Sequence, residues 1–435
     1  MKKRIIASLI IVCTLFMPIS SNAENNTIVE NTKIVASEQN ITLEYQKNEQ
    51  KEIENLPVIG CKAAYVAEPT TGKILYEKNA HQKMYPASTT KILTALVVME
   101  KCQMTDKVTV SKKALDMVPA GGSNAGLKQG EELSVSDMLY ALLIPSANEA
   151  ANALAEHVSG SVEEFAVLCN NRAKELGCEN LHFTNANGLH DENHYCTAYD
   201  LYLIAKECQK YDVFNEIVKT KSYTLPATNV YSKKDRVLKN TNYLLFSNLK
   251  NYYYPYCTGI KTGHTTPAGE CLVASSSYNN LELISVVLGG GTNSKGLNER
   301  FADTSQLFEF VYNNYAIKEV ANKENAISHI KVKHGTKDTA ELDVTLEKNI
   351  STIVPKDFNI ENIKKSINID EKISAPIKEN QVIGQATIYV DGLQYTVNII
   401  ASHDVKKIPY WLNISIILLA MLLIFIIIKL IKKKI

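Results

Sequence analysis

The sequence predicts an α+β domain over residues 56–315, a small all-β domain over 316–405 and a transmembrane helix over 408–428. Two strand patterns precede a long, mostly helical stretch, and three more strand patterns and a helix follow it. Strands from both ends of one domain pair most simply in a single sheet. We therefore expect an antiparallel sheet flanked by helices, with a helical lobe inserted between its strands.

The composition argues against a nucleic-acid partner. The chain has 435 residues and a formal net charge of +1. A nucleic-acid-binding surface is strongly basic, so this near-neutral balance indicates no such surface. The hydrophobic content of 45% is ordinary for a globular protein, and the length allows two or three domains with sizeable cores.

The N-terminus predicts an export signal over residues 1–23. Three basic residues follow Met1, an apolar run extends to Ile19, and Ser21-Asn22-Ala23 suits cleavage after small residues. The alternative is a retained anchor, which needs a longer apolar run than this one. Residues 24–55 are polar with little periodicity, and this pattern predicts a flexible linker.

The segment 408–428 carries no charge and is long enough to cross a bilayer, and Trp411 suits the membrane interface at its start. Four lysines follow the segment in the tail 429–435, whereas two lysines directly precede it. This bias predicts a cytoplasmic tail, with residues 24–407 on the outer side of the membrane. The alternative is a helix lying on the membrane surface, but the segment lacks a polar face.

Local signals place the elements of the α+β domain. Apolar residues predict strands at 61–67 and 73–77 around a turn that contains Gly72. A helix starts at Pro86 and runs through an apolar stretch to Met99. The later elements are predicted as helices at 138–143 and 149–157, a mostly helical stretch over 161–220 with an irregular part around Asn185-Ala186-Asn187-Gly188, strands at 259–263, 271–275 and 281–288, and a helix over 298–312.

Two dipeptides predict tight hairpin turns. Asn279-Asn280 separates the last two strands of the α+β domain, and Asp391-Gly392 separates two alternating strand patterns in 316–405. Both dipeptides suit turns that need positive φ angles. The clear alternation of apolar and polar residues on either side of Asp391 predicts that the second domain is all-β.

Eight cysteines remain after the predicted cleavage, and an even count in an exported protein permits disulfides. Reduced cysteines in the core are the favoured alternative, because a domain of this size needs no covalent cross-links. The spacing shows no Cys-x-x-Cys or clustered His and Cys pattern. We therefore predict neither a metal site nor a cofactor.

Ser88 and Lys91 are the candidate nucleophile and base. They stand three residues apart, on one face of the predicted helix, so Ser88 Oγ and Lys91 Nζ can come within hydrogen-bonding distance. The helix N-terminus offers free N–H groups to an anionic intermediate. An apolar run follows, so burial is expected to lower the pKa of Lys91 and let it act as a base. Ser-x-x-Lys is a short pattern that also arises by chance. Whether these two residues are catalytic therefore depends on the other motifs in the chain.

Lys261-Thr262-Gly263 lies on a strand that we expect beside the serine helix. Lys261 would hold a substrate carboxylate, and its charge would disfavour protonation of Lys91. Thr262 would hydrogen-bond the same carboxylate, and Gly263 would let a ligand backbone lie close to the strand. The alternative is an exposed strand end without a function.

Ser146-Ala147-Asn148 lies between two predicted helices. Ser146 would relay a proton between Lys91, Lys261 and a leaving group, and Asn148 would bind a substrate amide. Ser277-Tyr278-Asn279 has the same pattern. The loop position of the first copy is what favours it.

In this order the three motifs resemble the set shared by penicillin-binding proteins and serine β-lactamases. Within that set, four segments resemble the low-molecular-mass D-alanyl-D-alanine carboxypeptidases in particular: 86–96, 152–155, 191–195 and 259–265. The resemblance covers about residues 56–401, including Ala375-Pro376-Ile377 and Gly384 in the all-β domain. It implies a β-lactamase/transpeptidase-like fold for the α+β domain, and a C-terminal membrane attachment also fits.

The resemblance implies a penicillin-sensitive, serine-type D-Ala-D-Ala carboxypeptidase that acts in cell-wall biogenesis without a metal or cofactor. Ser88 would attack the penultimate D-alanine of a peptidoglycan stem peptide and form an acyl-enzyme. The backbone N–H groups of Ser88 and His264 would bind the oxyanion. Arg300 is the candidate for an arginine that the family uses downstream of its Lys-Thr-Gly strand. β-Lactams would acylate Ser88 as inhibitors, and the C-terminal helix would hold the enzyme at the membrane.

Three other functions stay open at this stage. A D,D-endopeptidase or a β-lactamase would use the same scaffold, although no glutamate-based deacylation motif is evident between Asn148 and Lys261. A non-catalytic, membrane-tethered scaffold that binds the cell wall is the alternative of another class. It would not need an activated serine, so the presence of all three motifs argues against it.

Overall fold

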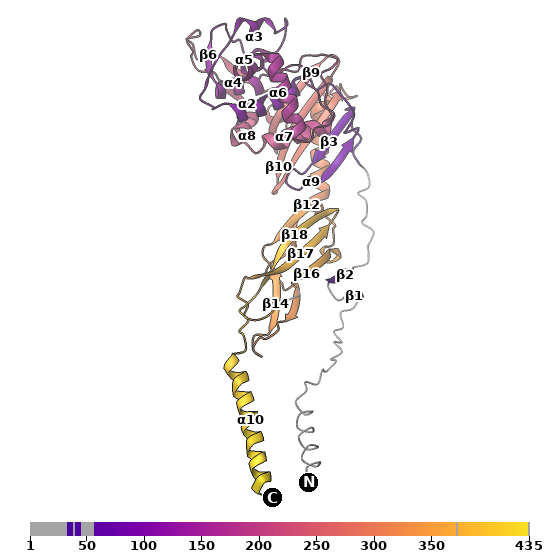
Figure 1. Ribbon diagram of the computed structural model, residues 1–435. Helices are drawn as coiled ribbons and strands as arrows, with labels where there is room; N and C mark the ends of the chain where they lie inside the picture. Colours follow the sequence, from indigo (N-terminus) through magenta and orange to yellow (C-terminus); the bar gives the residue numbers. More distant parts are fainter. Residues whose placement is uncertain (1–32, 38–39, 45–55, 371–372, 434–435) are drawn as a thin grey trace.

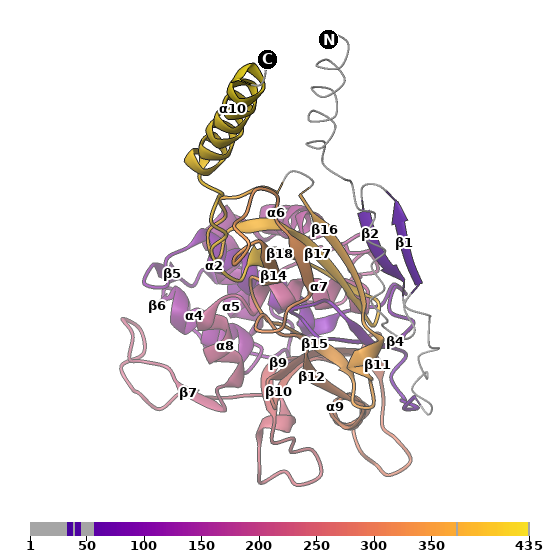
Figure 2. The ribbon, with the colours of Figure 1, turned by 90° about the horizontal axis from the view of Figure 1, so that it is seen from below.

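A computed structural model describes residues 33–37, 40–44, 56–370 and 373–433. The predicted signal peptide lies outside these residues. Figure 1 shows an elongated arrangement, with the α+β domain at one end, the all-β domain in the middle and a long helix at the C-terminal end. Figure 2 shows the same elements from below, with the C-terminal helix projecting from the all-β domain.

The α+β domain is built on a five-stranded antiparallel sheet with strand order β4-β3-β11-β10-β9. Its strands are β3 (Ala63–Ala67), β4 (Ile74–Lys78), β9 (Cys257–Thr265), β10 (Gly269–Tyr278) and β11 (Leu281–Gly290). As predicted, strands from both ends of the domain share this sheet. Asn279 and Asn280 adopt φ angles of 50° and 63° in the β10–β11 turn, so the predicted hairpin is confirmed.

Helices cover both faces of this sheet. One face packs on a helical lobe through a large apolar core, and the other packs on α9 (Glu299–Asn314). The helices of the lobe are α2 (Lys91–Lys101), α3 (Lys112–Asp116), α4 (Val135–Leu143), α5 (Asn148–Ser159), α6 (Val162–Glu175), α7 (Ala198–Cys208) and α8 (Asp212–Lys219). The shorter elements of the domain are the 3₁₀ turns η1 (Ala87–Thr90) and η2 (Tyr243–Leu245), and the strands β5 (Lys107–Thr109), β6 (Glu132–Ser134), β7 (Ser222–Thr224) and β8 (Val237–Lys239).

Local capping explains where several of these helices begin. Ser134 accepts the N–H of Asp137 at the start of α4, as the sequence pattern indicates. Thr197 and Asp200 form a reciprocal capping box at the start of α7. As predicted, an irregular loop that includes residues 185–188 interrupts the helical stretch 161–220 between α6 and α7, and this loop contains part of the candidate site described below.

The second domain is all-β, as predicted. Its main sheet has the order β1-β2-β16-β17-β18-β14-β13, in which β1 (Lys33–Ser37) and β2 (Asn40–Glu44) precede the α+β domain in sequence, and β12 pairs separately with β15. The strands are β12 (Tyr315–Ala321), β13 (Ser328–Lys331), β14 (Glu341–Leu346), β15 (Ile350–Pro355), β16 (Lys364–Ile369), β17 (Val382–Val390) and β18 (Leu393–Ala401), with a 3₁₀ turn η3 (Ile360–Asn362). The β17–β18 turn at Asp391 also contacts the α+β domain, because Lys73 Nζ donates to the Asp391 backbone carbonyl at 2.7 Å and pairs with its carboxylate.

The N-terminal part of this sheet differs from the sequence prediction. Residues 33–37 and 40–44, which were expected in a linker, form the antiparallel strands β1 (Lys33–Ser37) and β2 (Asn40–Glu44). Strand β2 pairs with β16. Both β1 and β2 contain apolar and β-branched residues, which suit strands, but they lie within a mostly polar segment whose overall composition predicted a linker. The remaining linker residues lie outside the described part of the chain.

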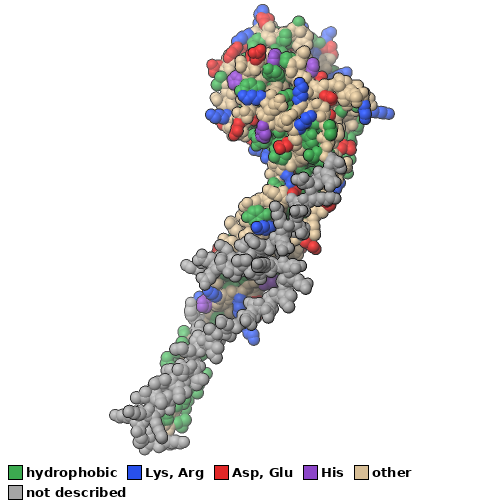
Figure 3. Space-filling model, turned by 90° about the vertical axis from the view of Figure 1, so that its right-hand side faces the viewer, with side chains coloured by type: hydrophobic (Ala, Val, Ile, Leu, Met, Phe, Trp, Pro, Cys, Tyr) green, Lys and Arg blue, Asp and Glu red, His purple; other side chains and the backbone are tan. Residues whose placement is uncertain are grey.

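The C-terminal helix α10 (Tyr410–Lys433) includes all but the first two residues of the predicted membrane segment 408–428. Within the described residues it is the one helix long and apolar enough to cross a membrane, and its apolar stretch Ile414–Lys432 is not buried against the rest of the protein. Figure 3 shows its hydrophobic side chains at the lower end of the molecule, whereas basic and acidic side chains are interspersed over the α+β domain. An exposed apolar helix of this length is typical of a membrane span.

Candidate active site

Ser88 and Lys91 meet at the junction of η1 and α2. Ser88 lies within the 3₁₀ turn, and Lys91 is the first residue of the α-helix. Lys91 Nζ lies 3.0 Å from Ser88 Oγ, the contact that the three-residue spacing predicts. The turn differs from the expected α-helix because it is tighter, with the Thr89 N–H donating to the Pro86 carbonyl three residues before it.

Lys91 is fully buried. Loss of solvation, together with the positive charge of Lys261, holds the pKa of Lys91 well below its ordinary value, although Glu149 opposes this shift. Its Nζ lies 2.8 Å from Asn148 Oδ1 and 2.5 Å from the Asn187 carbonyl. A neutral amine has two N–H donors and one lone pair. The two oxygens accept its N–H groups, and the lone pair remains to take the proton of Ser88.

A cleft of about 350 Å³ opens in front of Ser88. Seven of the nine predicted site residues line it: Ser88, Ser146, Asn148, Thr262, Gly263, His264 and Arg300. The other two, Lys91 and Lys261, are buried next to lining residues, which they contact through hydrogen bonds. Three sequence-distant motifs therefore share one cleft, as predicted.

Ser146 and Asn148 occupy the junction between α4 and α5. The Asn148 N–H donates to the Ser123 carbonyl, and its Oδ1 accepts from Lys91, so its amide nitrogen is left for a ligand. Ser146 has a φ of 70°, an unusual conformation for a residue with a side chain. Its hydroxyl is buried and has no hydrogen-bond partner among the described residues. Since Ser146 lines the cleft, this hydroxyl is available to a reacting group.

Strand β9 is an edge of the sheet and packs against η1. A side chain on Gly263 would come within 2.9 Å of the Pro86 carbonyl and 3.0 Å of the Ser88 nitrogen. The sequence analysis predicted that Gly263 lets the backbone of a ligand lie close to the strand. The structure shows that its lack of a side chain is also needed for β9 to lie against the nucleophile turn.

Lys261 and Thr262 are held firmly on β9. Lys261 Nζ donates to the Thr262 carbonyl at 2.8 Å, and the Thr262 hydroxyl contacts that of Thr241 at 2.5 Å. Burial, with a contribution from Arg300, lowers the pKa of Lys261 to about 7. A bound carboxylate would favour the charged form of this lysine.

Arg300 lies in the first turn of α9 and reaches β9. Its Nη1 donates to the Gly263 carbonyl at 3.1 Å and lies 2.6 Å from a carboxylate oxygen of Glu270. The His264 side chain is half exposed, with Nε2 3.6 Å from the same Glu270 side chain. Arg300, predicted from resemblance alone, therefore does lie in the cleft.

Two residues that the sequence prediction did not include complete the pocket. Asn187 accepts from Lys91 through its carbonyl, and its amide donates to Asn152 at 2.9 Å. Gly188 has a φ of 81°, and a side chain there would come within 1.9 Å of the Ala87 carbonyl. The one local signal for these residues was the irregular Asn-Ala-Asn-Gly stretch, which indicates a loop but not the surface that it contacts.

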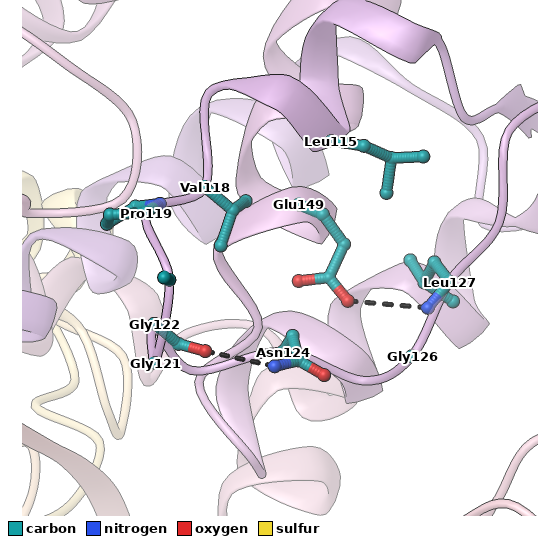
Figure 4. A pocket seen from close by; sticks show the side chains of 10 residues that line it. Leu115, Val118, Pro119, Gly121, Gly122, Asn124, Gly126, Leu127 and Glu149 are labelled. Carbon is teal, nitrogen blue, oxygen red and sulfur yellow. Dashed lines mark hydrogen bonds between the residues drawn. The ribbon is translucent and has the colours of Figure 1, made fainter.

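A second hollow adjoins the cleft and shares Gly121 and Gly122 with it. Figure 4 shows Glu149 in this hollow, with one carboxylate oxygen on the Leu127 N–H. The same oxygen accepts the Ala125 N–H at 2.7 Å, and the other oxygen has no partner among the described residues. Burial raises the pKa of Glu149. Glu149 thus fixes the loop that forms one wall of the cleft.

Cysteine chemistry does not enter this site. The eight cysteines of the described residues are unpaired, and six of them are buried. Burial raises the pKa of the Cys271 thiol to about 11 and that of Cys257 to about 12. These thiols behave as apolar core groups, which agrees with the favoured prediction of reduced cysteines.

Comparison with known proteins places the chain in one family. Residues 46–292 match the D-alanyl-D-alanine carboxypeptidase family, and residues 315–407 match the C-terminal domain of penicillin-binding protein 5. The chain is 37% identical over 353 residues to the D-alanyl-D-alanine carboxypeptidase DacF of Bacillus subtilis, covering 80% of this chain and 86% of that protein. It is 33% identical to DacC of Escherichia coli, covering 77% and 82%.

A solved structure supports the same assignment. Penicillin-binding protein 5 from Haemophilus influenzae superimposes with a TM-score of 0.61 at 29% identity, covering 81% of this chain and 99% of that one. The similarity therefore extends over both the α+β and the all-β domain.

Proposed function

The chain belongs to the D-alanyl-D-alanine carboxypeptidase family and is a serine-type D-Ala-D-Ala carboxypeptidase, and we propose that Ser88 is its nucleophile and Lys91 its base. One observation carries the proposal. Lys91 Nζ lies 3.0 Å from Ser88 Oγ, in a fully buried position that lowers the lysine pKa. An unprotonated amine at this distance can accept the serine proton as the hydroxyl attacks.

Acylation then proceeds in two steps. The Ser88 oxygen bonds to the carbonyl carbon of the penultimate D-alanine, and the serine proton moves to Lys91 Nζ. The C–N bond next breaks, and the leaving D-alanine nitrogen takes a proton. Ser146 is suited to pass this proton from Lys91, because its hydroxyl lines the cleft without a protein partner.

The substrate is held by groups on two sides of the cleft. Lys261 and Thr262 would bind the terminal carboxylate, with Arg300 adding positive charge from α9. The free amide nitrogen of Asn148 would bind a carbonyl of the peptide. The oxyanion would lie between the backbone N–H groups of Ser88 and His264, on η1 and on the edge strand β9.

Hydrolysis regenerates the enzyme. Water attacks the ester carbon, Lys91 takes a proton from it, and the C–O bond to Ser88 breaks with return of a proton to the serine oxygen. The product is a stem peptide shortened by one D-alanine. A β-lactam would acylate Ser88 by the same first step, with ring opening in place of departure of an amine.

The domain arrangement supports action at a membrane surface. We propose that α10 anchors the enzyme, that residues 429–435 lie in the cytoplasm, and that residues 24–407 lie outside after removal of the signal peptide 1–23. The all-β domain would act as a spacer between the membrane and the cleft. The order of the domains along the molecule in Figure 1 supports this role.

Labelled penicillin tests the nucleophile. The wild-type protein is expected to carry the label on Ser88, and Ser88→Ala is expected to carry none. Ser136→Ala, which removes a hydroxyl from α4 outside the cleft, is the matched control and should be labelled normally. Labelling of Ser88→Ala at any other serine would overturn the assignment.

Product analysis tests the reaction. A pentapeptide that ends in D-Ala-D-Ala should release free D-alanine, and Ser88→Ala should release none. Cleavage of cross-linked dimers without D-alanine release would instead support the D,D-endopeptidase. Rapid turnover of penicillin would support the β-lactamase.

A further inference from the structure

Three metal-ligating side chains converge on the lobe, away from the catalytic cleft. The ligand atoms of Cys102, Asp106 and His157 all lie within 4.8 Å of one another. We propose that these three residues bind a zinc ion, with a water molecule as the fourth ligand.

The backbone presents two of these ligands in a compact turn. Cys102 ends α2, where its N–H donates to the Val98 carbonyl at 3.0 Å. Asp106 follows four residues later, and one of its carboxylate oxygens accepts the Gln103 N–H at 2.7 Å. That bond orients the carboxylate and leaves its other oxygen for a cation, as is usual for carboxylates that bind metals.

The third ligand comes from a different helix. His157 lies in the last turn of α5, and its side chain is exposed. Because it is exposed, solvent can reach the trio and supply the open coordination position. Cys102 and Asp106 are partly buried, so the cation would be bound at the edge of the lobe rather than in its core.

The donor set selects the class of cation. A thiolate, an imidazole and a carboxylate are all ligands of Zn²⁺, which takes four ligands in a tetrahedron. Mg²⁺ and Ca²⁺ prefer oxygen ligands and are disfavoured by the sulfur and nitrogen atoms. The thiolate and the carboxylate also bring two negative charges toward a divalent ion.

The position of the trio gives the ion a structural role. Helices α2 and α5 contact each other, and both begin at the catalytic cleft, where Lys91 and Asn148 are joined by a 2.8 Å hydrogen bond. The trio joins the opposite ends of the same two helices. An 11-residue helix is about 16 Å long, so the ion would lie far from the reacting atoms. It would tie together the two helices that carry the catalytic lysine and its asparagine partner.

Cobalt provides a direct test, because a thiolate bound to Co²⁺ gives a charge-transfer absorption that oxygen ligands do not give. The full-length protein, reduced and metal-free in detergent, is titrated with Co²⁺. The expected result is one equivalent bound with this absorption, and its loss on addition of Zn²⁺. Zinc is also expected to raise the melting temperature of the wild-type protein.

Variants assign the ligands. Cys102→Ser should abolish the charge-transfer band, and His157→Ala and Asp106→Asn should each weaken Co²⁺ binding at least about tenfold. Cys257→Ser, which removes the other partly exposed cysteine, should leave the band unchanged. Labelling by penicillin checks that each variant is folded. Absence of the band in the wild-type protein, or its persistence in folded Cys102→Ser, would overturn the proposal.

Discussion

Replacing Gly188 with alanine should slow acylation strongly without removing any group that takes part in the chemistry. Gly188 has a φ of 81° and faces the turn that carries the nucleophile. A Cβ there would lie 1.9 Å from the carbonyl oxygen of Ala87, the residue directly before Ser88, and 2.5 Å from its carbonyl carbon. Both are backbone atoms, so no side chain can rotate away.

The size of the effect follows from this geometry. Ordinary contact begins at 3.4 Å, so the turn or the loop must move by about 1.5 Å. A displacement of about 1 Å at a reacting group costs on the order of 100-fold in rate. We therefore expect acylation by penicillin to slow by about 100-fold. The left-handed backbone costs about 1–2 kcal/mol and the overpacking about 1–3 kcal/mol of unfolding free energy.

Gly160 provides the matched control. It ends α5 with a φ of 78°, and nothing lies within 4 Å of the position that its Cβ would take. Gly160→Ala should lose the same 1–2 kcal/mol or so from backbone strain but should acylate at the wild-type rate. The assay is the second-order rate of labelling by fluorescent penicillin, with the unfolding free energy measured in urea. If folded Gly188→Ala acylates as fast as Gly160→Ala, the close packing of this loop on the nucleophile turn has no catalytic importance.

Three further predictions concern charge and membrane attachment. Glu149→Gln removes a negative charge that raises the pKa of Lys91, so the pKa of Lys91 should fall. Because acylation needs unprotonated Lys91, the acid limb of its pH profile should move to lower pH, and a move to higher pH would contradict this role. Arg236→Ala should cost about 3–5 kcal/mol, since it leaves the fully buried Glu131 without its ion-pair partner, and adding Glu131→Gln should restore part of the loss. Burial raises the pKa of Glu131, but hydrogen bonding from Arg236 outweighs this effect and holds the pKa below its ordinary value. The stabilisation of the fold by this ion pair should therefore be present at neutral pH and be lost as the pH falls through the lowered pKa. Removal of residues 408–435 should release a penicillin-binding protein from the membrane fraction, and its retention there would show a second anchor.

Local sequence predicts those parts of the site in which the spacing along the chain already determines the geometry. A spacing of three residues brings the side chain of Lys91 to that of Ser88, whether the turn between them is α-helical or 3₁₀-helical. Turn chemistry likewise places Asn279-Asn280 and Asp391-Gly392 between paired strands. These features depend on neighbours in sequence, so they need no knowledge of the fold.

The strands β1 and β2 show the limit of such reasoning. The segment 24–55 is mostly polar and predicts a linker, but two short strands form within it, and β2 pairs with β16, which is far along the chain. The role of Gly263 shows the same limit. The sequence indicates that something must lie close to Gly263, but it does not show that the turn around Ser88 is the segment that does so. Strand pairing and close packing depend on which distant segment lies alongside.

The family motifs, the α+β and all-β domain classes, the C-terminal apolar segment and the pairing of Ser88 with Lys91 can all be predicted from the residue pattern alone. The folded chain was needed to show that Asn187 accepts a hydrogen bond from Lys91, that Gly188 faces Ala87, and that His157 lies close to Cys102. The physical reason is that each of these contacts joins segments far apart in the chain. Their proximity comes from the packing of the lobe on the sheet, and no local spacing encodes it.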